Sequence, residues 1–196
     1  ESHVSYTLPA NVENLFLVSG TGDTTGTGNA RPNLIIGNEG NNQLSGVQGN
    51  NTLQGGEGND TLIGGLNRDT LEGGQGADVL ISGTGITTFV YNDLTDSLLN
   101  AFDTVQGFNA AIDFFQTSNP VTFSGDLGNA ADLTELSIQS VLGTFAPNTA
   151  AIFGVESTTL KYLAINDGVA GFSASSDAII DISGFAGIMS DANFVV

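Results

Sequence analysis

Six side chains that can ligate a hard cation recur along the chain at intervals of nine residues. They are three carboxamides and three carboxylates: Asn33, Asn42, Asn51, Asp60, Asp69 and Asp78. Glycine-rich stretches such as "GGEGNDTLIGG" surround them. The chain has 21 acidic residues, 3 basic residues and no cysteine, which excludes disulfides and thiolate metal sites. The net charge of -18 attracts cations and repels nucleic-acid phosphates, so we expect oxygen-ligated metal and no nucleic acid.

Residues for catalysis are sparse. The single histidine, His3, lies near a terminus, which leaves serine triads and histidine-based metal chemistry without a base or a ligand set. Neither a P-loop nor a dinucleotide-binding fingerprint occurs. A carboxylate pair for glycoside hydrolysis stays open among so many acids, although the chain has no tryptophan to form a sugar platform. We therefore expect a protein that is not an enzyme.

The elements that carry the candidate ligands repeat with the same period. Six units in unbroken register run from Gly28 to Ile81, and a weaker seventh follows at residues 82–90. Each unit is a glycine-rich turn of six residues and a strand of three, and it can bury its one large apolar side chain only by stacking on its neighbours. The predicted inward residues are Ile35, Leu44, Leu53, Leu62, Leu71, Leu80 and Phe89.

The units resemble the GGxGxDxUx repeat of the RTX family, which the units at Gly55 and Gly73 match fully. The resemblance implies a right-handed parallel β-roll with two nonapeptides per coil, so that turns 18 residues apart stack on one edge. A cation midway between turns about 4.8 Å apart lies about 2.4 Å from oxygens of both, which suits Ca²⁺. Glycine permits the positive φ angles of such turns, and aspartate supplies the charge. An empty glycine-rich solenoid is the alternative.

RTX sites imply a ligand set for several Ca²⁺ ions: carbonyls at positions two and four and the side chain at six of one turn, then positions one, three and six of the next. The best site joins Gly56, Gly58 and Asp60 to Gly73, Gln75 and Asp78. A second joins Val47, Gly49 and Asn51 to Gly64, Leu66 and Asp69, and a third joins Asn38, Gly40 and Asn42 to Gly55, Glu57 and Asp60. The pair Asn33 and Asn51 has only amide side chains and lies near Arg31, so its coil binds calcium weakly or forms without metal.

Both ends of the array carry further candidates. Downstream, residues 88–108 resemble the segment that closes RTX rolls, and Asp96 and Asp103 match the acids of a terminal calcium site. Asp96 lies 18 residues after Asp78, where position six of another turn is expected; an ordinary surface carboxylate is the alternative. Upstream, Val12, Leu15 and Leu17 either cap the first coil or pair with the edge of another molecule.

The resemblance to RTX proteins, with the change of composition near residue 91, implies a mainly β chain in three parts: a strand-rich arm or cap at residues 1–27, the β-roll at 28–90 and a small α+β domain at 91–196. A helix is predicted within residues 129–143, and three short apolar runs after it predict an antiparallel sheet. The apolar residues of that helix are Leu133, Leu136, Val141 and Leu142. This last part resembles the bluetail-type C-terminal domain of bacterial surface proteins, which implies no biochemical activity. We interpret its Asp167, Asp177 and Asp181 as turn and edge acids rather than as an ion site.

The route out of the cell has one candidate signal. No apolar run is long enough to span a membrane, and no N-terminal signal is visible. The end "SDANFVV" resembles uncleaved signals read by bacterial type I exporters, with a terminal edge strand as the alternative. We expect a secreted structural protein of the cell surface or extracellular matrix that folds on calcium and forms homo-oligomers, a layer or a filament. A folding and secretion module of a larger protein and a calcium-dependent adhesin are the alternatives.

Overall fold

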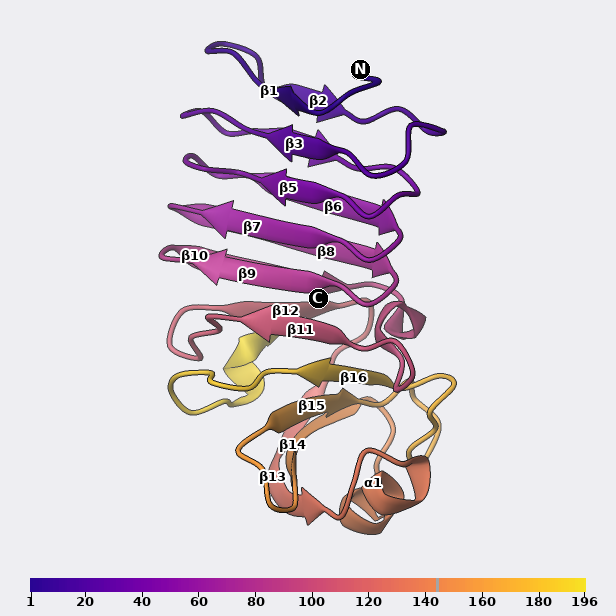
Figure 1. Cartoon of the computed structure of the whole chain (residues 1–196). Coiled ribbons are helices and arrows are strands. Elements are labelled where there is room, and N and C mark those ends of the chain that lie inside the picture. Colours follow the sequence, from indigo (N-terminus) through magenta and orange to yellow (C-terminus); the bar gives the residue numbers. More distant parts are fainter. Residues whose placement is uncertain (144) are drawn as a thin grey trace.

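The computed structural model describes residues 1–143 and 145–196, and strands dominate it (Figure 1). Within these residues the strands form one sheet of ten and one of seven. The ten-stranded sheet has the order β1 (Tyr6–Thr7), β3 (Thr25–Thr27), β5 (Gln43–Ser45), β7 (Thr61–Gly65), β9 (Val79–Gly83), β11 (Asp103–Gln106), β16 (Ala178–Asp181), β15 (Lys161–Ile165), β14 (Thr149–Val155) and β13 (Thr122–Ala130). The seven-stranded sheet has the order β17 (Phe194–Val195), β12 (Phe114–Thr117), β10 (Ile86–Tyr91), β8 (Arg68–Gln75), β6 (Thr52–Glu57), β4 (Leu34–Ile36) and β2 (Asn14–Phe16). The helices are α1 (Glu135–Leu142) and the 3₁₀ turns η1 (Leu94–Ser97) and η2 (Asp191–Asn193).

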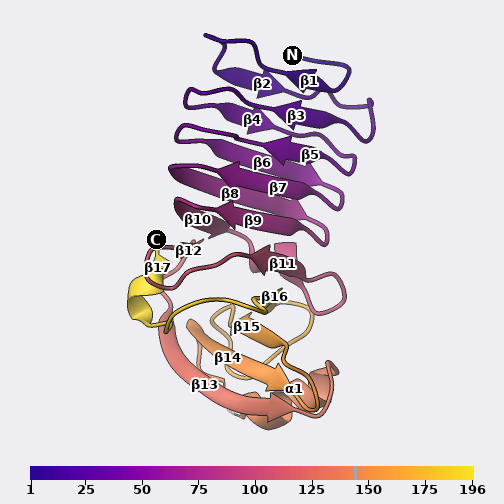
Figure 2. The same cartoon turned by 60° about the vertical axis from the view of Figure 1, so that its left-hand side comes forward.

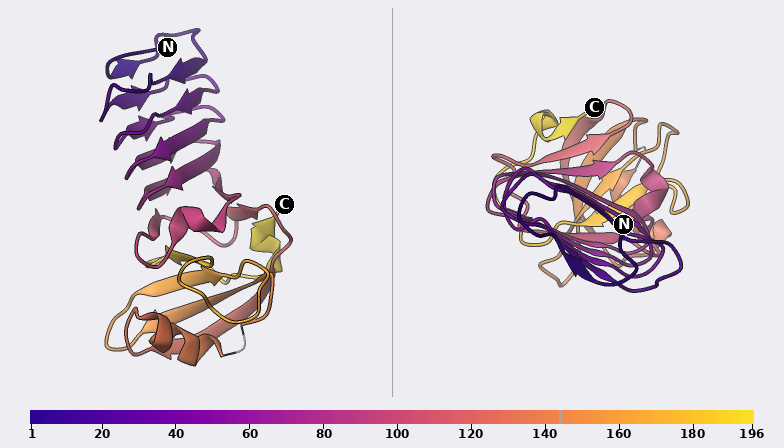
Figure 3. Two further views of the ribbon diagram at one scale, coloured as in Figure 1. Left: turned by 90° about the vertical axis from the view of Figure 1, so that its right-hand side faces the viewer. Right: turned by 90° about the horizontal axis from the view of Figure 1, so that it is seen from above.

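Successive strands of the repeats alternate between the two sheets, so that each pair of repeats makes one coil (Figure 2). Parallel partners lie 18 residues apart: Leu44 pairs with Leu62, and Leu53 with Leu71. Seen from above, the coils superimpose (Figure 3). The sheets keep open edges and do not close into a barrel. This mainly β arrangement agrees with a β-roll.

The predicted inward side chains form the core of this roll. All seven, from Ile35 to Phe89, have no exposed surface. They share one cluster with Leu8 and Leu15 at one end and with Val105 and Phe115 at the other. The prediction of one buried apolar residue per unit is therefore confirmed.

Residues before the first predicted unit add another coil to the same two sheets. Leu15 and Leu17 are buried, and Leu15 pairs with Ile35 of the next coil. Val12 instead keeps 39% of its surface exposed. The inward position of β3 is Gly26, where a Cβ atom would come within 2.9 Å of Ile35. The coil formed by β3 and β4 therefore has no room for a side chain at this position.

The coil after the repeats is longer than 18 residues. Leu80 pairs with Val105, and Phe89 pairs with Phe115. The inserted residues include η1, which contacts β8 and β16. Beyond this coil, β11 pairs in parallel with β16, so the C-terminal strands extend the ten-stranded sheet.

The predicted helix and strands are present in the C-terminal region, with one correction to the helix. Strands β14, β15 and β16 pair antiparallel, as expected, while β13 pairs with β14 in parallel. The helix begins only after Thr134, whose side chain accepts a hydrogen bond from Ser137 N. This start places Ile138 and Leu142 on the inward face, whereas Leu136, one of the apolar residues on which the helix was predicted, is 80% exposed.

The last residues pack onto the roll as the edge strand β17. The Phe194 ring stacks on those of Phe115 and Phe123, with centroids 6.0 Å away in each case. Recognition of this end by an exporter stays a prediction. Among the described helices, none is long and apolar enough to cross a membrane.

Candidate metal centres

The side chains at position six of the repeats form a ladder along each edge of the roll. Asn42 N donates to Asp60 Oδ1 at 2.6 Å, and Asp60 N donates to Asp78 Oδ1 at 2.7 Å. On the other edge Asn51 N donates to Asp69 Oδ1 at 2.9 Å, and Asn33 N donates to Asn51 Oδ1 at 3.0 Å. The structure thus brings together all four pairs of position-six residues that the sequence placed in stacked turns.

The three aspartates of the ladder each have one oxygen without a partner. Among the described residues, Oδ2 of Asp60, Asp69 and Asp78 is buried and accepts no hydrogen bond. Each of these side chains is only 1% exposed. A buried acceptor left unsatisfied costs about 1–3 kcal/mol, and more when it is charged. Three such oxygens at equivalent positions therefore point to a missing electropositive partner.

The unpartnered oxygens face space that only glycine leaves open. A Cβ atom on Gly55 would collide with Asp60 Oδ2 and would lie 2.5 Å from the carbonyl oxygen of Gly73 in the next coil. A Cβ atom on Gly64 would lie 2.9 Å from both Asp69 Oδ2 and the carbonyl oxygen of Ser82. Each space is thus bordered by a carboxylate oxygen and by the position-one carbonyl of the following turn.

The carbonyls at positions two and four face the next turn as well. Those of Gly56 and Gly58 lie directly against Gly74 and Gly76, which have φ angles of 99° and 144°. One coil earlier, Asn38 and Gly40 present their carbonyls to Gly56 and Gly58 in the same way. Only residues without Cβ fit there. The backbone oxygens expected as ligands in these turns therefore point between the coils.

The remaining expected backbone ligands differ in their surroundings. The carbonyl of Val47 accepts a hydrogen bond from Leu66 N at 3.1 Å, and that of Gly49 accepts one from Asn51 Nδ2 at 3.2 Å. Glu57 and Gln75 pair with each other across β6 and β8 and have exposed side chains. The carbonyl of Ser82 was not expected to border a site. Ser82 is position one of the weak seventh unit, and this position in the repeat could have predicted its role.

Asparagine at position six closes its turn without an ion. Asn51 Nδ2 donates to the carbonyls of Gln48 and Gly49 and to Asp69 Oδ1. Asn42 Nδ2 donates to Asn38 Oδ1 and Thr24 Oγ1, while its Oδ1 accepts from Asn38 N. The amide donor occupies the place where aspartate has its unpartnered oxygen. The asparagine turns are therefore satisfied by the protein alone.

Both ladders end at aspartates whose two oxygens are satisfied. Asp103 Oδ1 accepts from Asp78 N at 2.9 Å, and its Oδ2 accepts from the Tyr91 hydroxyl at 2.9 Å. On the other edge Asp113 accepts from Thr87 N, Asn109 N and the Ser82 hydroxyl. These last rungs need no cation to complete their hydrogen bonding.

The assignment of Asp96 to position six was wrong. The coil after Asp78 is lengthened, so the next rung is Asp103, and Asp96 lies in η1 half-buried. Asp113 was missed. Asp103 and Asp113 each lie two residues before a core residue, Val105 or Phe115. The repeats have the same spacing, so it could have predicted both aspartates even where the glycines are absent.

Burial raises the pKa values of the ladder carboxylates. The pKa of Asp60 is about 6, mainly through loss of solvent, opposed by the hydrogen bond from Asn42 N and reinforced by the charge of Asp23. For Asp78 the pKa is about 7, again mainly through burial, with the charges of Asp60 and Asp96 adding to it. Burial likewise raises the pKa of Asp69. In the absence of a cation, ionisation of these buried carboxylates at neutral pH therefore lowers the free energy of unfolding.

The donor set fits a hard divalent cation. Each space offers carboxylate and carbonyl oxygens, the ligands that Ca²⁺ takes at about 2.3–2.6 Å. Among residues 1–143 and 145–196, no three acidic or histidine side chains cluster in a way that could hold a metal by themselves. Ligation therefore has to combine the aspartates with the backbone. A bound ion would supply the positive charge that the three unpartnered oxygens lack.

Fold and turns together define a parallel roll with candidate cation sites between its coils. Residues 18–53, 45–80 and 54–88 each match a family model described as the RTX calcium-binding nonapeptide repeat (4 copies). The chain thus contains RTX repeats, which bind calcium, and the match begins upstream of Gly28. No significant match was found among proteins of curated function. The resemblance of the C-terminal region to a bluetail-type domain stays a prediction.

Proposed function

We propose that the chain is a secreted structural protein whose roll is completed by calcium at the turns of Asp60, Asp69 and Asp78. The observation that carries the proposal is the buried, unpartnered oxygen on each of these aspartates. Cytosolic calcium is kept low, so a roll that requires it would complete its folding outside the cell. Type I export of RTX proteins fits this order of events.

Calcium titration of the chain tests this function. After treatment with EGTA, far-ultraviolet circular dichroism should lose β signal, and millimolar calcium should restore it. Isothermal titration should count three ions. A β signal that is unchanged by EGTA, with no heat of calcium binding, would show that the roll forms as an empty solenoid.

A second part of the proposal is that copies associate through the N-terminal coil. Strands β1 and β2 are edge strands, and four large apolar side chains on or beside them are at least 39% exposed: Val4, Tyr6, Val12 and Phe16. Unpaired strand edges with apolar side chains favour strand addition between molecules. A layer or filament of calcium-loaded copies would follow.

The two alternative functions, a secretion module and an adhesin, predict different gene organisation and different binding. A folding and secretion module would be encoded with a catalytic domain in the same reading frame. An adhesin would bind a sugar or a protein in the presence of calcium. Sequencing of the natural locus separates the first alternative from a structural protein.

A further inference from the structure

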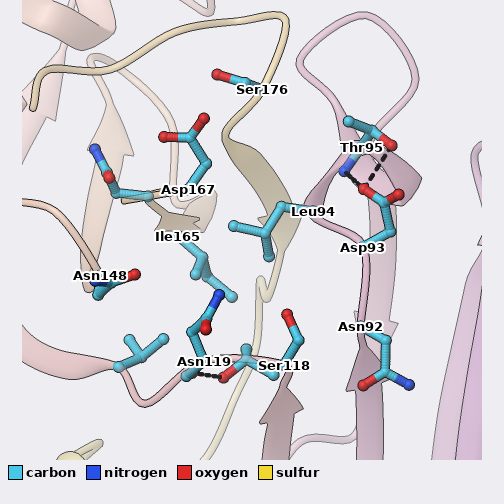
Figure 4. Close-up of a pocket in the computed structure, with 13 residues that line it drawn as sticks. Asn92, Asp93, Leu94, Thr95, Ser118, Asn119, Asn148, Ile165, Asp167 and Ser176 are labelled. Carbon is cyan, nitrogen blue, oxygen red and sulfur yellow. Dashed lines mark hydrogen bonds between the residues drawn. The ribbon is translucent and has the colours of Figure 1, made fainter. Parts of the chain in front are cut away.

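A polar cavity lies beside the lengthened coil, at its junction with the C-terminal strands (Figure 4). Its volume is about 370 Å³. Five separate segments line it: residues 92–95 after β10, residues 117–119 with Val121 at the end of β12, Asn148 before β14, residues 165–167 at the end of β15, and Ser176 before β16. It therefore exists only when the last coil and the C-terminal strands are assembled.

The floor of this cavity is aliphatic. Leu94, Val121 and Ile165 line it, and Ile165 is fully buried while the other two are half-buried. Figure 4 shows the Leu94 side chain between Asp167 on one side and Asp93 on the other. The two carboxylates thus lie on opposite sides of an apolar surface.

The rim offers hydrogen-bonding groups that the protein does not use. Within the described chain, no hydrogen bond engages the side chains of Asn92, Ser118, Asn119, Asn148 and Ser176. Asp167 Oδ1 accepts from Val169 N, and the Asp167 carboxyl also interacts with that of Asp177, whose pKa burial raises to about 6. The neighbouring Asn166 differs, because its amide is fully engaged by Gly168 N and by the carbonyls of Val169 and Gly171. These five side chains are therefore available to a ligand in the cavity.

The charges around the cavity exclude several ligand classes. The chain's three cationic residues are Arg31, Arg68 and Lys161, and none of them lines it. Asp93 and Asp167 repel anions such as phosphates and acidic sugars. Among the described residues, no three acidic or histidine side chains gather here or elsewhere to hold a metal ion by themselves. An ammonium ligand would pair with one carboxylate. It has no acceptor atom, so the NH₂ groups of the three amides would have nothing to donate to.

We propose that this cavity binds a neutral sugar. Sugar hydroxyls both donate and accept, which matches amides, hydroxyls and a carboxylate arranged around the rim. The apolar face of a pyranose ring would lie on the aliphatic floor. The volume is at the lower end of the range of about 300–1,000 Å³ for ligand pockets, so one or two sugar units are the expected size. With no aromatic side chain in the lining, affinity is expected near millimolar, about -4 kcal/mol.

This inference does not depend on the calcium proposal. No residue of the cavity is a ligand in the proposed calcium turns. Calcium loading is measured by circular dichroism and sugar binding by a separate titration. Either proposal can therefore be contradicted without affecting the other. Both measurements use the full chain.

A glycan array with the calcium-loaded chain provides the first test. We expect binding to neutral glycans and none to their sialylated or sulfated forms. Titration with the best neutral disaccharide, followed by amide chemical shifts, then gives the affinity. Asn119→Ala and Asp167→Asn should each weaken binding about tenfold, which corresponds to about 1.4 kcal/mol. Both side chains are exposed, so folding should be kept.

Asn100→Ala is the matched control, because Asn100 is exposed and lies outside the cavity. Its affinity should equal that of the unmodified chain. The proposal is overturned if the folded, calcium-loaded chain binds no neutral glycan. It is also overturned if it prefers amines or acidic glycans, or if the cavity variants bind as well as the Asn100 control.

Discussion

Position six of each repeat distinguishes two kinds of turn. Aspartate and asparagine have the same shape and both use one oxygen in the ladder. The second group of asparagine is a donor, and at Asn51 it is satisfied by carbonyls of its own turn. The second group of aspartate is an acceptor that faces other acceptors, so it requires a proton or a cation. One atom therefore decides whether a turn needs calcium.

Asp60→Asn should convert a calcium-dependent turn into a self-satisfied one. The new amide would donate to turn carbonyls as Asn51 does, and one charge would leave a buried site. We expect one calcium ion fewer by titration and a higher melting temperature for the calcium-free protein. Glu156→Gln, which removes an exposed charge outside the repeats, is the control and should change neither. An unchanged ion count would mean that Asp60 is not a ligand.

The stability of the calcium-free roll should fall as pH rises from about 4 to about 7. The pKa values of Asp60 and Asp78 are raised to about 6 and about 7, mainly by burial. Between the ordinary aspartate pKa, about 3.9, and these values the folded state holds protons that the unfolded state has released. The free energy of unfolding then decreases with pH.

Calcium should reverse this trend, because the ion binds the ionised carboxylates and competes with protons. Urea unfolding at several pH values, with chelator and with millimolar calcium, measures both slopes. A calcium-free roll that becomes more stable towards pH 7 would contradict the burial of unpaired charge in these turns.

At the scale of elements, the lengthened coil ends both ladders without metal. The Tyr91 hydroxyl satisfies Asp103, and Ser82 and Asn109 satisfy Asp113. Burial raises the pKa of Asp103 to about 8, with the charge of Asp78 adding to it. This coil joins the repeats to the C-terminal strands through β11 and β16. We therefore expect it to provide an end for the stack that forms without calcium.

Tyr91→Phe tests this closing element. Loss of the hydroxyl leaves Asp103 Oδ2 buried without a partner, which should cost about 1–3 kcal/mol of unfolding free energy. The cost should be the same with and without calcium, and the number of bound ions should not change. Tyr6→Phe is the control, because Tyr6 is 46% exposed and its hydroxyl has no hydrogen-bond partner in the described structure. One additional calcium ion in the Tyr91 variant would show that Asp103 is a metal ligand, as its sequence context first indicated.

At the scale of the whole molecule, charge opposes association and calcium lowers that charge. The chain carries -18, and each ion would remove two units of it. If three sites are each filled at tenfold over the dissociation constant, linkage adds about 4 kcal/mol to stability. In 0.15 M salt the remaining repulsion is screened beyond about 8 Å. Contact between N-terminal coils becomes feasible under these conditions.

We therefore expect the sedimentation coefficient to increase with protein concentration in calcium and not in EGTA. Tyr6→Lys and Phe16→Lys place charge on the edge strands β1 and β2, where both side chains are exposed. These variants should remain monomeric in calcium. The control Leu136→Lys, on the exposed face of α1, should associate like the unmodified chain. A monomer at every concentration would leave the secretion-module and adhesin functions.

The sequence alone was sufficient for the features that repeat. A period of nine residues identified the inward residues, and the resemblance to RTX repeats, with two units per coil, implied the register of 18 that the structure has. Each coil packs on an equivalent neighbour. The residue pattern of one repeat therefore determines both which side chains are buried and which position-six residues stack. The same reasoning ranked aspartate turns above asparagine turns as calcium sites.

Tertiary structure decided what depends on contacts between unlike segments. The insertion after Leu80 shifted the rung from Asp96 to Asp103, because spacing is not fixed once the repeat is lost. Whether an aspartate oxygen is free or satisfied depended on distant groups such as the Tyr91 hydroxyl. The polar cavity is formed by five segments that no sequence period relates, so only their packing in space brings those side chains together.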